Sequence, residues 1–125
     1  MPKQKVMLIE DDIDTTILLT ILLKYENYGA VKLEINNEDD LIMQIKRSLC
    51  EVLLIDVNLN GIDGINLLTR IRNELDGYNP FVIMTSALDL TNQCMKAGAD
   101  CFLQKPYDPA DLFTALSSHT LVAQR

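Results

Sequence analysis

Five polar side chains that can bind metals or phosphates lie at or next to the ends of apolar segments. They are Glu10, Asp11, Asp56, Thr85 and Lys105. If the apolar segments are parallel strands of one sheet, their carboxyl ends lie along one edge, and these side chains share one crevice. Acids, a hydroxyl and a lysine in one crevice are typical of a metal-assisted phosphate site.

The elements that would position these groups alternate between strand and helix five times. Apolar runs predict strands over residues 6–9, 30–35, 52–55, 81–84 and 101–103. Helical spacing of apolar residues predicts the helices between them: residues 13 to about 25, the segments behind the caps Asn37 and Asp63, about 90–97, and the segment that begins at the Asp108–Pro109 cap.

This alternation predicts an α/β fold with a parallel sheet and helices on both faces, formed by one domain over residues 1–125. Residues 6–9 and 52–55 are apolar throughout, as in strands that are buried on both faces. Residues 30–35 alternate between apolar and charged side chains, which favours a strand at the edge of the sheet.

The predicted helices also have candidate inner faces. In the first helix, Ile13, Ile17 and Ile21 recur at every fourth position, with Leu18 and Leu22 beside them, so we expect these five side chains to pack on the sheet. The other expected inner faces consist of Leu41, Ile42, Ile45 and Leu49; Ile65, Leu67, Leu68, Ile71 and Leu75; and Leu112, Phe113, Leu116 and Leu121.

Composition narrows the possible partners. The 125-residue chain is 48% hydrophobic and has a formal net charge of −7, which disfavours direct binding to nucleic acid or to an anionic membrane. No apolar run has the length of a membrane span and no signal peptide precedes the first strand, so we expect a cytoplasmic protein. Three cysteines without a Cys-x-x-Cys pair disfavour a disulfide framework or a zinc site.

Asp56 is the candidate nucleophile. An aspartate at the end of a buried strand, followed by a glycine-containing loop over residues 57–64, can attack phosphorus and form an acyl phosphate. Taken alone, such an aspartate is more typical of a helix cap or a turn. Glu10 and Asp11 favour the chemical role, because three converging carboxylates repel one another unless a divalent cation compensates them. Oxygen ligands favour Mg²⁺ or Mn²⁺.

Lys105 and Thr85 complete the candidate site. Lys105 is the only basic residue between Lys96 and Arg125, and its ammonium can pair first with Asp56 and then with a phosphate oxygen. Thr85 offers a hydroxyl to the same oxygens. An ordinary surface lysine and an ordinary strand-terminal threonine are the alternatives for each residue alone. Their joint placement favours the phosphate site.

The order of these motifs resembles the receiver domain of bacterial two-component response regulators over essentially the whole chain. The matching pieces are Leu8-Ile9-Glu10-Asp11-Asp12, Leu54-Ile55-Asp56 with Gly61-Ile62-Asp63-Gly64 downstream, Met84-Thr85-Ser86 and Lys105-Pro106-Tyr107. The resemblance implies a (βα)5 flavodoxin-like fold with strand order 2-1-3-4-5. It also implies a phosphoacceptor with slow autodephosphorylation, which is not a turnover enzyme.

The resemblance further implies that Asp56 accepts a phosphoryl group from the phosphohistidine of a sensor histidine kinase or a phosphotransfer protein. Glu10 and Asp11 match the acidic pair of the family, with Asp11 the more direct metal ligand. Asp56 and the backbone carbonyl of Asn58 complete the implied Mg²⁺ site. Lys105 matches the lysine of the family pattern.

The remaining implied roles concern the switch. The Lys105–Pro106 peptide bond is implied to be cis. Thr85 and Phe102 match the switch pair, so that a new charge on Asp56 draws Thr85 inward and reshapes the face made by the fourth helix, fifth strand and fifth helix. That face would control a downstream protein or an effector domain outside this chain, as a monomer or as a phosphorylation-dependent dimer.

Three further residues have open roles. Asn60 stands where the family usually has proline, and we expect it to loosen the turn slightly. Tyr107 fits the switching face and packing against the last helix equally well. His119 is a candidate second phosphoacceptor, although a lone histidine in a final helix is more typical of an exposed or capping residue.

Rival functions come from other classes of protein. An aspartyl-nucleophile phosphohydrolase of the haloacid-dehalogenase type would carry an acid two residues after the nucleophile, where this chain has Asn58. A flavin carrier of similar fold would have a hydroxyl- and glycine-rich loop after the first strand, where this chain has acids. A receiver-like module that is never phosphorylated is the third alternative.

Overall fold

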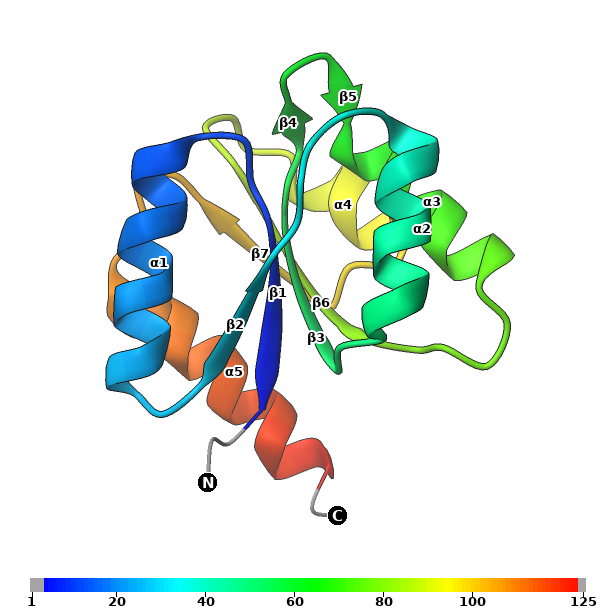
Figure 1. Cartoon of the computed structure of the whole chain (residues 1–125). Coiled ribbons are helices and arrows are strands. Elements are labelled where there is room, and N and C mark those ends of the chain that lie inside the picture. The colour runs from blue at the N-terminus through cyan, green and yellow to red at the C-terminus, as the bar shows by residue number, and fades with distance from the viewer. Residues whose placement is uncertain (1–3, 124–125) are drawn as a thin grey trace.

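The computed structural model describes the backbone of residues 4–123 and the side chains of residues 4–119. A five-stranded sheet forms its centre, and all neighbouring strands of this sheet are parallel (Figure 1). In spatial order the strands are β2 (Gly29–Lys32), β1 (Lys5–Ile9), β3 (Val52–Asp56), β6 (Phe81–Ser86) and β7 (Cys101–Gln104). Because β4 and β5 form a separate hairpin, this order is the predicted flavodoxin-like order 2-1-3-4-5.

Helices cover both faces of the sheet, as predicted (Figure 1). Helices α1 (Ile13–Tyr25) and α5 (Pro109–Ala123) pack on one face. Helices α2 (Glu38–Ser48), α3 (Gly64–Glu74) and α4 (Thr91–Ala97) pack on the other. The chain reverses direction through each helix, so every strand of the sheet ends at the same edge.

Residues 6–9 of β1 and residues 52–55 of β3 are buried on both faces of the sheet, which explains why these segments are apolar throughout. Successive side chains of a strand point to opposite sides of the sheet. The core under α2, α3 and α4 includes Met7, Ile9, Leu53 and Ile55. The core under α1 and α5 includes Val6, Leu8, Val52 and Leu54. The predicted edge strand is also confirmed, because β2 pairs with β1 alone, but it spans Gly29–Lys32 and ends before the predicted residues 33–35.

The prediction for the inner face of α1 is wrong. Ile13, Ile17 and Ile21 are 65%, 54% and 60% exposed, and Leu18 is also exposed. The buried residues of α1 are Thr16, Leu19 and Leu23. Isoleucine and leucine occur on most sides of this helix, so periodicity alone does not identify its inner face. Thr16 can be buried because its hydroxyl donates to the Asp12 carbonyl at 3.0 Å.

The predicted helix caps are confirmed. A side-chain oxygen accepts a backbone N–H bond near each helix start: Asn37 from Asp40 at 2.8 Å, Asp63 from Ile65 at 2.9 Å and Asp108 from Ala110 at 3.0 Å.

Leu49, expected on the inner face of the second helix, is instead the residue that ends α2. It adopts a left-handed conformation and is 53% exposed. The expected core role of Leu121 concerns a side chain outside the described residues.

A hairpin that was not predicted follows β3. Strands β4 (Asn58–Leu59) and β5 (Ile62–Asp63) pair antiparallel through a two-residue turn. The turn residues Asn60 and Gly61 have φ angles of 50° and 92°, as in a type I′ turn, for which Asn-Gly is the preferred sequence. Asn60 therefore does not loosen the turn. It forms a regular hairpin, and its φ angle is one that proline cannot adopt.

Candidate functional site

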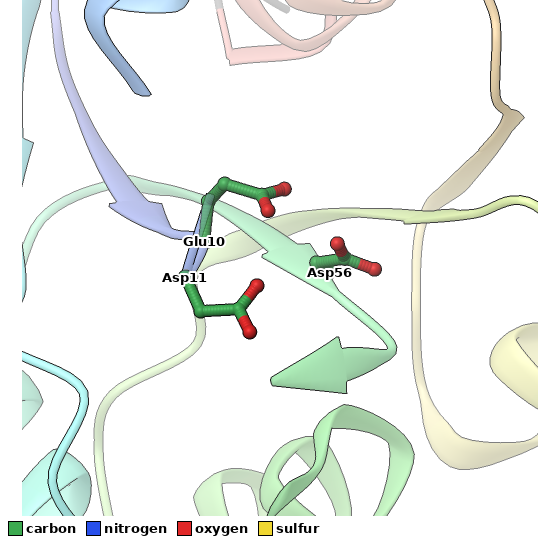
Figure 2. A group of neighbouring side chains, drawn as sticks. All are labelled: Glu10, Asp11 and Asp56. Carbon is green, nitrogen blue, oxygen red and sulfur yellow. The ribbon is translucent and has the colours of Figure 1, made fainter. Parts of the chain in front are cut away.

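Three carboxylates meet at the edge where the sheet strands end (Figure 2). Asp56 is the last residue of β3, and Glu10 and Asp11 follow β1. One carboxylate oxygen from each lies within 4.8 Å of the other two. Glu10 and Asp56 are buried and Asp11 is exposed. Because β1 and β3 are hydrogen-bonded neighbours, the sheet itself brings these acids together.

Lys105 reaches the same pocket from the other side of the sheet edge. It follows β7, and its Nζ atom donates to Asp56 Oδ2 at 2.8 Å and to Glu10 Oε2 at 3.0 Å. Its backbone N–H donates to the Ser86 carbonyl at 2.8 Å, which ties the residue to the end of β6. The Lys105–Pro106 peptide bond is cis.

The pocket holds more negative than positive charge, since three carboxylates face one ammonium. Burial raises the pKa of Glu10 to about 7, although the hydrogen bond from Lys105 opposes this rise. Burial also acts to lower the pKa of Lys105, but its hydrogen bonds with Asp56 and Glu10 outweigh that effect and raise it. The ammonium therefore stays charged while Glu10 titrates near neutral pH.

Backbone N–H groups bind the second carboxylate oxygen of Asp56 and of Glu10. The Asn58 N–H donates to Asp56 Oδ1 at 3.1 Å, and the Asp12 N–H donates to Glu10 Oε1 at 3.1 Å. The Asp12 carboxylate itself accepts from the Thr15 N–H at 3.0 Å and caps α1. The three acids after β1 thus have different roles: Asp12 caps helix α1, whereas Glu10 and Asp11 belong to the acidic pocket.

Thr85 lies beside Asp56 on the neighbouring strand. The two residues are paired in the β3–β6 ladder, and Thr85 is 2% exposed. Its carbonyl accepts a hydrogen bond from the Val57 N–H at 2.9 Å. Phe102 lies on β7, where it pairs with Met84 and is half-buried at the border of the core. The structure therefore places Thr85 next to Asp56 and Phe102 one strand further away.

The donor set fits a hard divalent cation. All the candidate side-chain ligands are carboxylate oxygens, and when all three are ionised their negative charge exceeds the charge of the Lys105 ammonium by two. The exposed Asp11 leaves one side of the pocket open to solvent, and Mg²⁺ usually keeps several of its waters. Glu10, Asp11 and Asp56 are thus suited to Mg²⁺ or Mn²⁺.

An apolar groove of about 420 Å³ adjoins the pocket on the side of α1. Leu18, Leu22, Pro106 and Tyr107 line it, together with the stem of Lys105. Tyr107 is half-buried against the core under α1 and α5, and burial raises the pKa of its hydroxyl. Sequence periodicity did not find this groove, because it assigned Leu18 and Leu22 to the core.

His119 lies far from this pocket along the strand direction. Its ring stacks on Phe81, with the ring centroids 4.7 Å apart. Phe81 begins β6, whereas the acidic pocket lies at the ends of the strands.

The cysteines have no place in the pocket either. Their thiols are free, and burial raises the pKa of each one. A raised pKa disfavours the reactive thiolate.

Comparison with known proteins identifies relatives of the same architecture. The family model of the response regulator receiver domain matches residues 6–117. A 14.6 kDa protein of Leptolyngbya boryana is 29% identical, over 93% of this chain and 89% of its own length. The DNA-binding response regulator MtrA of Mycolicibacterium paratuberculosis is 25% identical, over 88% of this chain and 48% of its own length.

A solved structure agrees with these matches. The signal receiver domain of a protein described as a LuxO repressor, from Vibrio parahaemolyticus, has a TM-score of 0.82 and 27% identity. The similarity covers 97% of this chain and 92% of that chain.

The chain belongs to the response regulator receiver domain family, because the family match spans most of its length. Receiver domains are phosphoacceptor signalling domains of two-component systems and are not turnover enzymes in the usual sense. The family implies interaction with histidine kinases and output domains. The chain spans about half the length of MtrA. No helix among the described residues is both long and apolar enough to cross a bilayer.

Proposed function

We propose that residues 1–125 form one receiver domain that is switched by phosphorylation of Asp56. The observation that supports this best is the Asp56 carboxylate, which is buried, lies in a cluster of acids and accepts a hydrogen bond from Lys105 Nζ at 2.8 Å. The phosphoryl group comes from the phosphohistidine of a sensor histidine kinase or a phosphotransfer protein.

In the transfer step, a carboxylate oxygen of Asp56 attacks phosphorus while the phosphorus–nitrogen bond of the donor breaks. The electron pair of that bond returns to the donor imidazole. The Lys105 ammonium then moves from the carboxylate to a phosphoryl oxygen, and the Thr85 hydroxyl binds another. Phosphoryl transfer depends mainly on positioning and charge compensation, which these side chains supply.

Glu10, Asp11, Asp56 and the backbone carbonyl of Asn58 would hold Mg²⁺ or Mn²⁺. When bound, the cation neutralises the charge of the carboxylates and of the phosphoryl oxygens. The acyl phosphate is lost slowly by hydrolysis, so the phosphorylated state persists until hydrolysis ends it.

The switch then acts through Thr85 and Phe102. A phosphorylated aspartate adds a dianionic group beside Thr85 and draws its hydroxyl inward. Phe102 enters the space that Thr85 leaves, and the face formed by α4, β7 and α5 changes shape. This face controls a downstream protein or an effector domain outside the chain. The domain acts as a monomer or as a phosphorylation-dependent dimer in the cytoplasm, and its net charge of −7 disfavours direct contact with nucleic acid.

The phosphodonor protein would contact the exposed ridge of α1. Ile13, Ile17 and Ile21 form this apolar ridge, and Leu18 connects it to the groove beside Lys105. A donor that packs on the ridge would therefore lie close to the groove and to the pocket beyond it.

The test is phosphorylation by acetyl phosphate with and without Mg²⁺, followed by intact-mass spectrometry. We expect one phosphoryl group on the wild type in the presence of Mg²⁺ and none on Asp56→Asn. The matched control is Asp63→Asn, because Asp63 is an exposed cap on the same loop and asparagine also caps helices. Phosphorylation of Asp56→Asn at the wild-type rate would refute the assignment. Release of many equivalents of phosphate from an ester would favour the phosphohydrolase instead.

A further inference from the structure

Gly64, the first residue of α3, lies directly against the backbone of Asp56. A Cβ atom at Gly64 would lie 2.3 Å from the Asp56 carbonyl oxygen and 2.9 Å from Val57 Cα. Both distances are far shorter than van der Waals contact, so no side chain fits there. The Gly64 N–H also donates to the Val57 carbonyl at 2.7 Å. The chain therefore returns to Asp56 eight residues after leaving it.

The segment between these two residues is closed by the β4–β5 hairpin. Asn58 pairs with Asp63, and Leu59 pairs with Ile62, in the β4–β5 hairpin. Leu59 is fully buried and anchors the hairpin in the core. The hairpin leaves little freedom to move Gly64 away from Asp56.

The two elements that meet at this contact differ in how firmly they are held. Helix α3 is fixed by Leu67, Leu68 and Ile71, which are fully buried. Asp56 is paired with Thr85 on the β6 side, but the pairing with β1 ends one residue earlier, at Ile55. An added atom at Gly64 is therefore accommodated by a shift of the Asp56 backbone, which is held on one side only.

We propose that Gly64 is a positioning residue that sets the place of the Asp56 carboxylate by direct contact with the Asp56 backbone. The Asp56 carboxylate is also fixed through the Asn58 N–H, which belongs to the same closed loop. This inference rests on the proposed role of Asp56 as metal ligand and phosphoacceptor. Gly64 would contact neither the metal ion nor the phosphoryl group. It would nevertheless determine whether the Asp56 carboxylate is aligned with both of them.

The experiment is a titration of Mg²⁺ into Gly64→Ala at pH 8, followed by NMR of backbone amides, with no phosphodonor present. We expect the dissociation constant for Mg²⁺ to rise at least about fivefold, because a metal site tolerates little displacement of a ligand. Under saturating Mg²⁺, we also expect slower phosphorylation by acetyl phosphate, since the attacking oxygen is displaced.

Two glycines give matched controls. Gly77→Ala strains a residue whose φ angle is +76° but whose Cβ atom meets nothing within 4 Å, so it lowers stability without touching the site. Gly29→Ala places its Cβ atom 3.2 Å from the flexible side chain of Lys5, at the opposite end of the sheet. We expect both controls to bind Mg²⁺ within twofold of the wild type.

The outcomes separate this inference from the proposed function. A wild type that binds no Mg²⁺ contradicts the proposed function itself. A wild type that binds Mg²⁺, together with a Gly64→Ala protein within twofold of it, overturns the positioning role alone. If Gly64→Ala is partly unfolded by circular dichroism, the titration is repeated in sucrose, which favours compact states. Failure to fold even there also overturns the inference, because Gly64 would then support the whole fold and not one carboxylate.

Discussion

Lys105 Nζ lies 2.8 Å from Asp56 Oδ2. Asp56 ends β3 and Lys105 follows β7, and these two strands are separated by β6. The lysine spans that distance with its long stem, and its side chain is 28% exposed. The ammonium thus reaches the carboxylate at the edge of the sheet where the strands end, beside the acidic pocket. This placement lets one cation serve Asp56 before the reaction and a phosphate oxygen after it.

Lys105→Met should separate metal binding from phosphoryl transfer. We expect phosphorylation by acetyl phosphate to slow by about 10²-fold, the usual effect of losing one donor to a developing negative charge. Mg²⁺ binding should tighten, because the variant removes a positive charge from beside Glu10 and Asp56. Rates from intact-mass spectrometry and Mg²⁺ titrations by NMR measure the two effects. Parallel losses of affinity and rate would show that Lys105 merely supports the pocket.

The Mg²⁺ affinity should depend on pH through Glu10. Burial raises the pKa of Glu10 to about 7, and a bound cation requires the ionised carboxylate. Above pH 7 the affinity should therefore be constant, and below pH 7 it should fall by up to about tenfold per pH unit. Mg²⁺ titrations at several pH values between about 5.5 and 8.5, on both sides of the Glu10 pKa of about 7, test this dependence. Glu10→Gln should bind Mg²⁺ more weakly and without this pH dependence.

The same group should make the stability of the metal-free protein fall as pH rises toward neutrality. Between the ordinary pKa of 4.5 and the folded pKa of about 7, folded Glu10 keeps a proton that the unfolded chain has lost. The free energy of unfolding therefore decreases through this window and is constant above it. Urea melts of the wild type and Glu10→Gln isolate the effect, because glutamine does not titrate. Parallel curves for the two proteins would contradict it.

The sheet and the convergence of the site residues could be predicted because both follow from strand topology. Residues 6–9 and 52–55 had to be buried on both faces, which places them at the centre of the sheet. Parallel strands end at one edge, so Glu10 and Asp56 had to lie near each other. The pairing of Lys105 with Asp56 was predicted and is confirmed, whereas its second hydrogen bond, to Glu10, was not predicted, because it depends on how a long side chain folds back across β6.

The inner face of α1 and the β4–β5 hairpin could not be predicted for different reasons. Helix α1 is apolar on most sides, so the repeat of Ile13, Ile17 and Ile21 indicated a stripe without showing which stripe faces the sheet. The hairpin strands have two residues each, too few for an alternating pattern. Asn60–Gly61 was the available signal, since Asn-Gly between apolar residues is the preferred sequence of a two-residue hairpin turn.

Substitutions on α1 should distinguish its exposed ridge from its buried face. Ile17→Ser should change the free energy of unfolding by no more than about 0.5 kcal/mol, because Ile17 is 54% exposed. Leu19→Ala should cost about 2–4 kcal/mol, because Leu19 is 5% exposed and its loss leaves a cavity. Urea denaturation measures both. A larger cost for Ile17→Ser than for Leu19→Ala would mean that the helix is rotated from its position in the structure.

Ile17→Ser should also slow transfer from a phosphorylated donor protein while leaving phosphorylation by acetyl phosphate unchanged. The reason is that only a protein donor contacts the ridge of α1, whereas the small molecule needs the pocket alone. Transfer of radiolabelled phosphate from the kinase, compared with the rate from acetyl phosphate, provides the measurement. Met43→Ser on α2 is the matched control, because Met43 is an apolar side chain that is 50% exposed and lies on the other face of the sheet. Equal rates from the protein donor for wild type and Ile17→Ser would exclude contact at this ridge.

Asn60 gives a test of the turn itself. Proline fixes φ near −65°, so Asn60→Pro cannot keep the observed φ of 50° and must break the type I′ turn. We expect a loss of about 1–2 kcal/mol in the free energy of unfolding, whereas Asn60→Gly, which adopts positive φ freely, should stay within about 0.5 kcal/mol. Urea melts of the wild type, Asn60→Pro and Asn60→Gly measure this, and NMR coupling constants report the φ angle of residue 60 in the wild type and in Asn60→Gly. A stabilised Asn60→Pro would show that the turn accepts the proline of the family and that the hairpin geometry is not required by this sequence.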